Sequence, residues 1–110
     1  MKNRIERINK LIKEKIADIL LKEIFVRDVL ITVQNVDTTK DLKYTKIKVS
    51  VMPFKKSEEV LKILKKNLPN LQKILNSEIR IKFVPKIIFQ IDESEEGVDK
   101  IDRILKNLYK

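Results

Sequence analysis

The sequence predicts an α+β domain of two layers, in which helices cover one face of a three-stranded sheet. Near the N-terminus, apolar residues recur at three- and four-residue steps, which is typical of an amphipathic helix. Later segments alternate apolar and other residues, as strands with one buried face do. Helical patterns follow these segments. The predicted order is helix, strand, strand, helix, kink, helix, strand and a last helix.

The first predicted helix starts close to the N-terminus and ends near Phe25. Its apolar stripe consists of Ile5, Ile8, Ile12, Ile16, Ile19 and Leu20. Asn3 stands where a helix cap is expected. Two pairs, Glu6 with Lys10 and Asp18 with Lys22, have the i,i+4 spacing and the acid-first order that favours ion pairing.

Two strands are predicted next, over 29–33 and 45–51, because their residues alternate with a period of two. The polar connection 37–41 resembles a turn, so we expect an antiparallel hairpin. Pro53 should end the second strand, since proline has no N–H to donate to a sheet.

A helix capped by Ser57 is expected after this hairpin, with Glu58 and Glu59 in its first turn, where the helix dipole favours acids. It should break over 67–70, because Pro69 disfavours helical geometry in the residue before it. A short helix then runs over about 70–75.

The third predicted strand covers 79–84 and resumes over 87–91 after Pro85. One side of it would present Arg80, Lys82, Val84, Lys86, Ile88 and Gln90. Phe83 and Phe89 fall on the other side and are predicted core residues, and Phe25 should pack at the end of the first helix. The last helix is expected over about 95–108, with Val98, Ile101, Ile104, Leu105 and Leu108 on one side.

The composition excludes several classes of function. The 110 residues suit one domain, and they contain no His, no Cys and only one Gly. Disulfides, Cys/His zinc sites, Cys nucleophiles, His bases and glycine-rich phosphate loops are therefore excluded. No apolar run reaches the roughly 18–20 residues of a membrane span, and no signal peptide is evident. A cytoplasmic binding protein with a polyanionic partner remains, because the net charge is +9.

The charge is uneven along the chain. Residues 1–91 hold 21 basic and 10 acidic side chains, against 4 and 6 in residues 92–110. Asp92, Ser94, Glu96 and Gly97 fit the first positions of a calcium loop, but the twelfth position is Arg103 instead of Glu, so we expect no metal site. Two alternatives to nucleic-acid binding are less favoured. A carboxylate nuclease is disfavoured because the acids are consecutive, and a membrane-surface or protein-partner module built on the first helix is disfavoured because the helix stripe is needed for the core.

Several stretches stand together in a recognisable order. They are Arg4-Ile5-Glu6-Arg7-Ile8, Ile31-Thr32-Val33 with Asp41-Leu42, Lys46-Ile47-Lys48-Val49-Ser50-Val51, and Ile79-Arg80-Ile81-Lys82-Phe83-Val84-Pro85 leading to Phe89 and Asp92. In this order the chain resembles the ribosome-binding factor A family of bacterial small-subunit maturation factors, from about residue 4 to 108.

The resemblance implies a fold similar to the type II KH domain, with residues 1–92 as the KH-like RNA-binding domain and 93–110 as its C-terminal helical extension. It also implies a non-enzymatic factor without cofactor that binds the free 30S subunit and its 16S rRNA and assists late rRNA maturation and processing. The expected protein is a cytoplasmic monomer, and an assembly GTPase is left open as a second partner. The alternative is a general RNA-binding or RNA-chaperone module without ribosome specificity.

The chain departs from the family in three places. KH domains usually hold RNA with a GxxG loop, which the family replaces with an Ala-x-Gly kink. Here the place reads Asn67-Leu68-Pro69, so proline is expected to produce the kink. Gln72 stands where the family usually has Arg, and Lys86 where it usually has Glu.

Basic residues are the candidate RNA ligands, because cations neutralise phosphates and release counterions. The predicted set is Arg4, Arg7, Lys10, Lys55, Lys56, Lys65, Lys66, Lys73, Arg80, Lys82 and Lys86. An ordinary solvated surface is the alternative for each. Phosphate contact is favoured for the 55–56, 65–66 and 80–82 groups, on the expectation that no acid is near them in sequence. Phe54 and, less so, Tyr44 are the candidates for base stacking.

Overall fold

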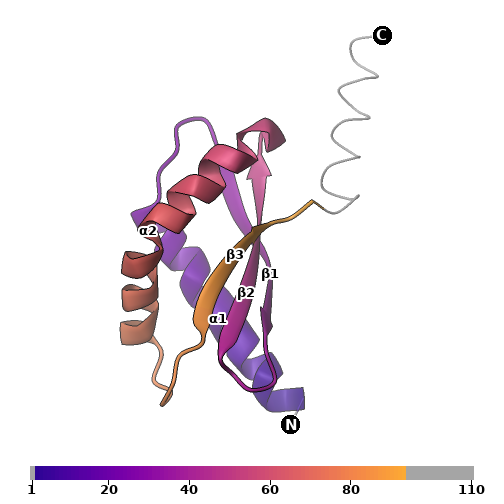
Figure 1. The fold of residues 1–110 in the computed structure, drawn as a ribbon, viewed down its shortest axis with the longest axis vertical. Coiled ribbons are helices and arrows are strands. Elements are labelled where there is room, and N and C mark those ends of the chain that lie inside the picture. Colours follow the sequence, from indigo (N-terminus) through magenta and orange to yellow (C-terminus); the bar gives the residue numbers. More distant parts are fainter. Residues whose placement is uncertain (1, 94–110) are drawn as a thin grey trace.

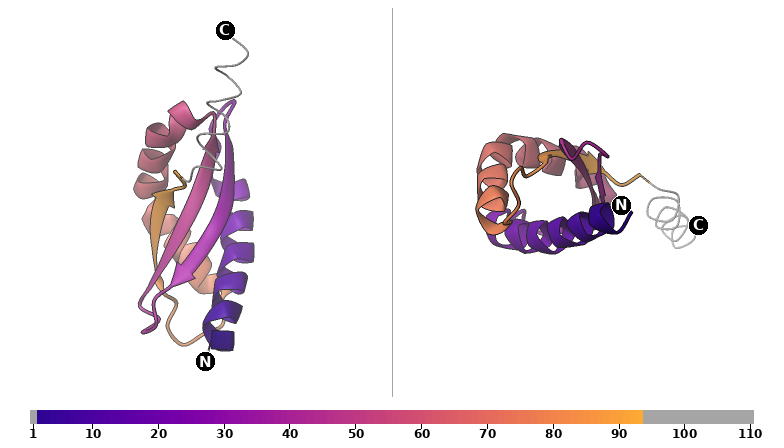
Figure 2. Two further views of the ribbon diagram at one scale, coloured as in Figure 1. Left: turned by 90° about the vertical axis from the view of Figure 1, so that its right-hand side faces the viewer. Right: turned by 90° about the horizontal axis from the view of Figure 1, so that it is seen from below.

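The computed structural model describes residues 2–93. They form α1 (Lys2–Glu23), β1 (Leu30–Thr38), β2 (Tyr44–Met52), the short 3-10 helix η1 (Phe54–Lys56), α2 (Ser57–Glu78) and β3 (Lys86–Ile91). The strands make one three-stranded sheet in the order β1-β2-β3, with β1 antiparallel and β3 parallel to β2. Both helices lie against this sheet (Figure 1; Figure 2). The predicted α+β class is confirmed.

The core lies between the helices and one face of the sheet. The α1 stripe supplies it through residues 8, 12, 16, 19 and 20, all buried as predicted, while Ile5 is half-buried. From β2, Thr45, Ile47, Val49 and Val51 face it, and from α2, Val60, Leu64, Leu71 and Leu75. The buried residues alternate along β2 and recur at helical spacing along α2, so both elements contribute to one apolar layer.

The first helix differs from its prediction in small ways. It begins at Lys2, so Asn3 stands inside the helix instead of capping it. Lys22 Nζ lies 3.1 Å from Asp18 Oδ2, as expected for an i,i+4 pair. The other predicted pair, Glu6 with Lys10, is not among the ion pairs of residues 4–93. Phe25 is 87% exposed, so the prediction that it packs at the helix end was wrong.

The hairpin turn lies further along the chain than the sequence suggested. β1 continues to Thr38, and its register with β2 shifts between Val33 and Asn35. This bulge changes the side that alternate residues face, which buries Val36 and Thr38. The connection is therefore 39–43, where Leu42 adopts φ 62° and its N–H donates to the Thr39 carbonyl at 2.9 Å.

The second helix is continuous through Pro69, so the predicted break and separate short helix were wrong as such. Figure 1 shows instead that the helix changes direction along its length. Proline offers no N–H to the carbonyl four residues earlier, which permits a bend. Ser57 is not the cap either: it is the first helical residue, and its buried Oγ has no hydrogen-bond partner among the described residues.

The third strand is shorter than predicted. Residues 79–85 form no strand, and β3 begins at Lys86, which lies opposite Tyr44, the first residue of β2. The residues before Lys86 have no β2 residue opposite them to pair with, because β2 begins at Tyr44. Pro85 also has no N–H to donate to a sheet. Phe89 is buried as predicted, but Phe83 is 74% exposed, so its assignment to the core was wrong.

The predicted last helix over 95–108, the glycine at 97 and most of the acidic C-terminal segment lie outside the described residues. Within the described residues, no helix is long and apolar enough to cross a membrane.

Candidate nucleic-acid interface

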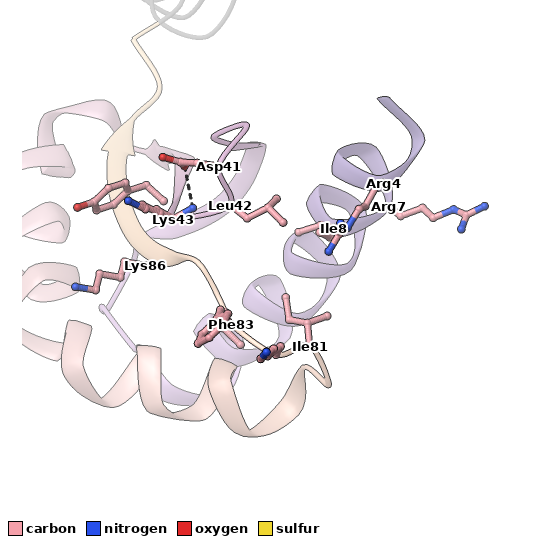
Figure 3. A pocket seen from close by; sticks show the side chains of 12 residues that line it. Arg4, Arg7, Ile8, Asp41, Leu42, Lys43, Ile81, Phe83 and Lys86 are labelled. Carbon is pink, nitrogen blue, oxygen red and sulfur yellow. Dashed lines mark hydrogen bonds between the residues drawn. The ribbon is translucent and has the colours of Figure 1, made fainter. Parts of the chain in front are cut away.

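A groove of about 1010 Å³ lies where three segments meet. The first turns of α1 form one wall, the β1–β2 turn forms another, and the loop between α2 and β3 closes it (Figure 3). We call it the basic groove. These segments come from the start, the middle and the last third of the described chain, and only the fold brings them together.

The floor of the basic groove is apolar. In Figure 3 the side chains of Ile8 and Leu42 point toward each other, with Ile81 below them. Two aromatic residues border this floor. Tyr44 is 45% exposed and Phe83 is 74% exposed, while Lys82 Nζ lies 5.6 Å from the centroid of the Phe83 ring. This distance is within the range of a cation–π contact.

The rim of the basic groove is strongly positive. Its cations are Arg4, Arg7, Lys43, Lys82 and Lys86, and none of them forms an ion pair with a described acid. Such unpaired cations around a concave surface attract a polyanion.

Among the described residues, Asp41 is the only carboxylate that lines the basic groove. Its Oδ1 accepts hydrogen bonds from Thr39 Oγ1 at 2.6 Å and from the Lys43 N–H at 3.1 Å. These hydrogen bonds stabilise the charged carboxylate and hold the pKa of Asp41 below its usual value. The bond from the Thr39 hydroxyl makes the largest contribution, and the bond from the Lys43 N–H comes next. The Asp41 carboxylate therefore stabilises the β1–β2 turn through these hydrogen bonds.

The fold gathers some of the predicted RNA-binding residues and separates others. Arg4, Arg7, Lys82 and Lys86 line the basic groove together. Arg80 is exposed in the same loop but does not line it, and Lys82 does not lie on a strand, because residues 79–85 form none. Lys10 is exposed on α1 beyond the groove.

The predicted pair Lys55 and Lys56 lies in η1, just after β2. The groove is at the opposite end of this nine-residue strand, roughly 26 Å away at about 3.3 Å per residue. The expectation that no acid is near this pair was wrong, because Lys56 Nζ lies 3.6 Å from Glu59 Oε2. On α2, Lys65 and Lys66 precede Pro69 and Lys73 follows it, and all three are exposed.

Lys43 and Phe83 are among the groove residues that the sequence did not predict. Lys43 falls in the connection between the strands, whose position was set too early in the chain. Phe83 was assigned to the core through the alternation of a strand that does not form. The proline after it, Pro85, was the available signal that the alternation would not continue.

Among the described residues, no three or more His, Cys, Asp or Glu side chains cluster so as to hold a metal ion. The arrangement of cations, aromatic rings and an apolar floor suits the binding of an anionic ligand.

Comparison with known proteins shows the family of this chain. The family model described as "Ribosome-binding factor A" matches residues 4–105. The chain belongs to the ribosome-binding factor A family. A relative from Dictyoglomus thermophilum, ribosome-binding factor A, is 40% identical over 116 residues, which cover 98% of this chain and 92% of the relative.

Solved structures of the family share the fold. The crystal structure of ribosome-binding factor A from Thermus thermophilus superimposes with a TM-score of 0.68 at 21% identity, covering 79% of this chain and 94% of that one. A Thermus thermophilus model fitted into the cryo-EM map of a complex with the 30S subunit has a TM-score of 0.65 at 22% identity, covering 74% and 88%. These structures have a KH-like fold, which confirms the predicted fold type.

Proposed function

We propose that this protein binds the free 30S ribosomal subunit through its 16S rRNA and assists late maturation and processing of that RNA. One observation carries the proposal: a KH-like domain of the ribosome-binding factor A family presents a groove rimmed by five cations that have no described acid partner. The family member from Thermus thermophilus that was fitted into a 30S complex supports the small subunit as the partner.

The proposed contact surface has two parts. The first is the basic groove, which holds four of the predicted residues and Lys43. The second is the exposed lysines of η1 and α2, on both sides of the bend at Pro69. Cations on both parts would neutralise phosphates, a contribution that does not depend on sequence and weakens with salt. Recognition of the subunit then rests on the shape of the RNA that meets both parts.

In this proposal the protein acts by binding alone, as a cytoplasmic monomer without a cofactor. Ordering an rRNA segment needs phosphate and base contacts but no nucleophile or metal. An assembly GTPase is a further proposed partner, which would act on the bound subunit.

Sedimentation of ribosomal particles with the added protein tests the proposal. The protein should travel with free 30S subunits and be nearly absent from 70S ribosomes. A uniform distribution over all particles, or none on 30S subunits, would contradict it. Competition with transfer RNA distinguishes the alternative, because a general RNA-binding module would be displaced from the subunit by an equal mass of any RNA.

Incubation of 16S rRNA with the protein and magnesium tests the absence of enzymatic activity. The RNA should remain at full length. Shortening that depends on the protein would contradict a function by binding alone.

A further inference from the structure

We propose that the basic groove holds an unpaired nucleotide of RNA, with its base stacked on the ring of Phe83 and its neighbouring phosphates on the cations of the rim. This inference deepens the proposed RNA-binding function and rests on it. It adds a ligand class, single-stranded RNA with a free base, and a residue that recognises the base.

The first argument is the position of Phe83. The ring is 74% exposed although the protein has a closed core nearby, with Ile79 and Phe89 both buried. The core therefore does not need the Phe83 ring. The Lys82 amine, 5.6 Å from the ring centroid, occupies one face of the ring. The rest of the ring is open to solvent. A base can stack on this open surface while the Lys82 amine stays over the other face of the ring.

The second argument is the apolar floor. Phosphates gain nothing from Ile8, Leu42 and Ile81, whereas a base can cover these side chains with a flat, weakly polar face. The volume of about 1010 Å³ is at the upper end for small-ligand sites, so a nucleotide fits. A base inside a duplex is stacked on its neighbours and cannot enter the groove, which makes an unpaired base the requirement.

The third argument is charge. Five cations surround the floor, and Asp41, the one carboxylate described there, is already hydrogen-bonded within its own turn. Arg4 and Arg7 stand one helical turn apart on α1, on the wall opposite the turn that carries Lys43 (Figure 3). Cations therefore stand on both walls, and an anionic backbone that runs along the outer edges of the groove can reach them. An acidic peptide matches this charge but offers no flat ring for Phe83, so the groove fits RNA better.

Fluorescence provides a direct test, because the chain contains no Trp. The variant Phe83→Trp places an indole in the groove, and Phe25→Trp places one on a side chain that is 87% exposed outside it. The probes are a 12-nucleotide A/U single strand and the same strand annealed to its complement. The single strand should quench the emission of the Phe83→Trp variant and leave that of Phe25→Trp unchanged, while the duplex quenches neither.

Binding measurements complete the test. Phe83→Ala should weaken binding of the single strand roughly 5- to 150-fold, the range for one stacked base. The slope of affinity against salt should stay the same, since no cation is lost. Phe25→Ala is the matched control and should bind as the unaltered protein does. Both side chains are exposed, so both variants should keep the unfolding temperature of the unaltered protein.

Three results would overturn the inference. One is equal affinity of Phe83→Ala and the unaltered protein for the single strand, or no binding of the single strand at all. Another is quenching by the duplex as strong as by the single strand. The third is quenching by poly-glutamate and not by RNA, which would assign the groove to an acidic protein segment. Sedimentation with 30S subunits judges the proposed function separately, since a Phe83→Ala protein that still binds both the subunit and the single strand refutes only the stacked base.

Discussion

The side-chain amide of Gln72 pairs with the backbone of Ile87. The Ile87 N–H donates to Gln72 Oε1 at 2.8 Å, and Gln72 Nε2 donates to the Pro85 carbonyl at 3.1 Å. One side chain of α2 thus satisfies a donor and an acceptor at the start of β3. The role of Gln72 in this structure is to fasten the edge strand β3 to α2.

Replacing Gln72 by Met tests this role. Methionine keeps the length of the side chain but makes neither hydrogen bond, which leaves two partly buried backbone groups unpaired. We expect the free energy of unfolding to fall by about 1–3 kcal/mol, measured by urea denaturation, and the Ile87 amide to exchange faster with solvent. Asn76→Ala is the control, because it removes only the 3.0 Å bond from Gln72 on the exposed face of α2. Equal losses in the two variants would contradict the role.

The bend of α2 gives a second prediction. Pro69→Ala restores an N–H that can bond to the Lys65 carbonyl, so the helix should straighten and the free energy of unfolding should rise by roughly 1–3 kcal/mol. Residual dipolar couplings measure the angle between the two halves. Lys66→Ala adds an alanine in the same region without a new N–H and should change stability by less than about 0.5 kcal/mol. A bend that persists in Pro69→Ala would show that packing of Leu64 and Leu71, and not proline, sets the angle.

The two groups of cations should contribute differently to RNA binding. Each phosphate contact on a single strand contributes about 0.7 to the slope of log affinity against log salt. Replacing Arg7 and Lys43 by Ala should therefore lower the slope by about 1.4. The matched pair Lys55→Ala with Lys56→Ala should lower it less, because Lys56 already pairs with Glu59. Filter binding at several salt concentrations measures the slope for both double variants. A larger fall in slope for the Lys55 and Lys56 variant would contradict the prediction.

The turn beside the groove should respond to acid. The Thr39 hydroxyl, followed by the Lys43 N–H, lowers the pKa of Asp41. The ionised carboxylate therefore stabilises the folded turn above the ordinary value near 4, and this stabilisation is lost as the pH falls through the lower folded value. Titration of the carboxyl carbon by NMR should show the lowered pKa.

Two variants identify the cause of that shift. Thr39→Val removes the hydroxyl and should raise the pKa of Asp41 toward its ordinary value. Thr39→Ser retains a hydroxyl and should keep the pKa low. The same pKa in both variants would mean that the hydroxyl does not cause the shift.

Most of the fold is visible in the sequence because its elements are defined locally. The stripe of α1 and the alternation of β2 are each the pattern of one element with one buried face, and both are confirmed by Ile12, Ile16, Ile47 and Val49 at 0% exposure. The predicted third strand fails over 79–85 for the opposite reason. Its alternation is just as regular, but a strand also needs a partner, and β2 begins only opposite Lys86.

The candidate site was predicted in its chemistry but not in its arrangement. An excess of cations without His or Cys already indicated binding to a polyanion. No pattern in the chain relates Arg4 to Lys43 or Lys82, because their meeting depends on how α1 lies along the hairpin. The sequence by itself determined the charge, the apolar stripe of α1 and the alternation of β2, and it predicted a polyanionic partner. The tertiary structure alone decided which cations share a groove and that Phe83 is exposed, since those outcomes depend on contacts between segments far apart in the chain.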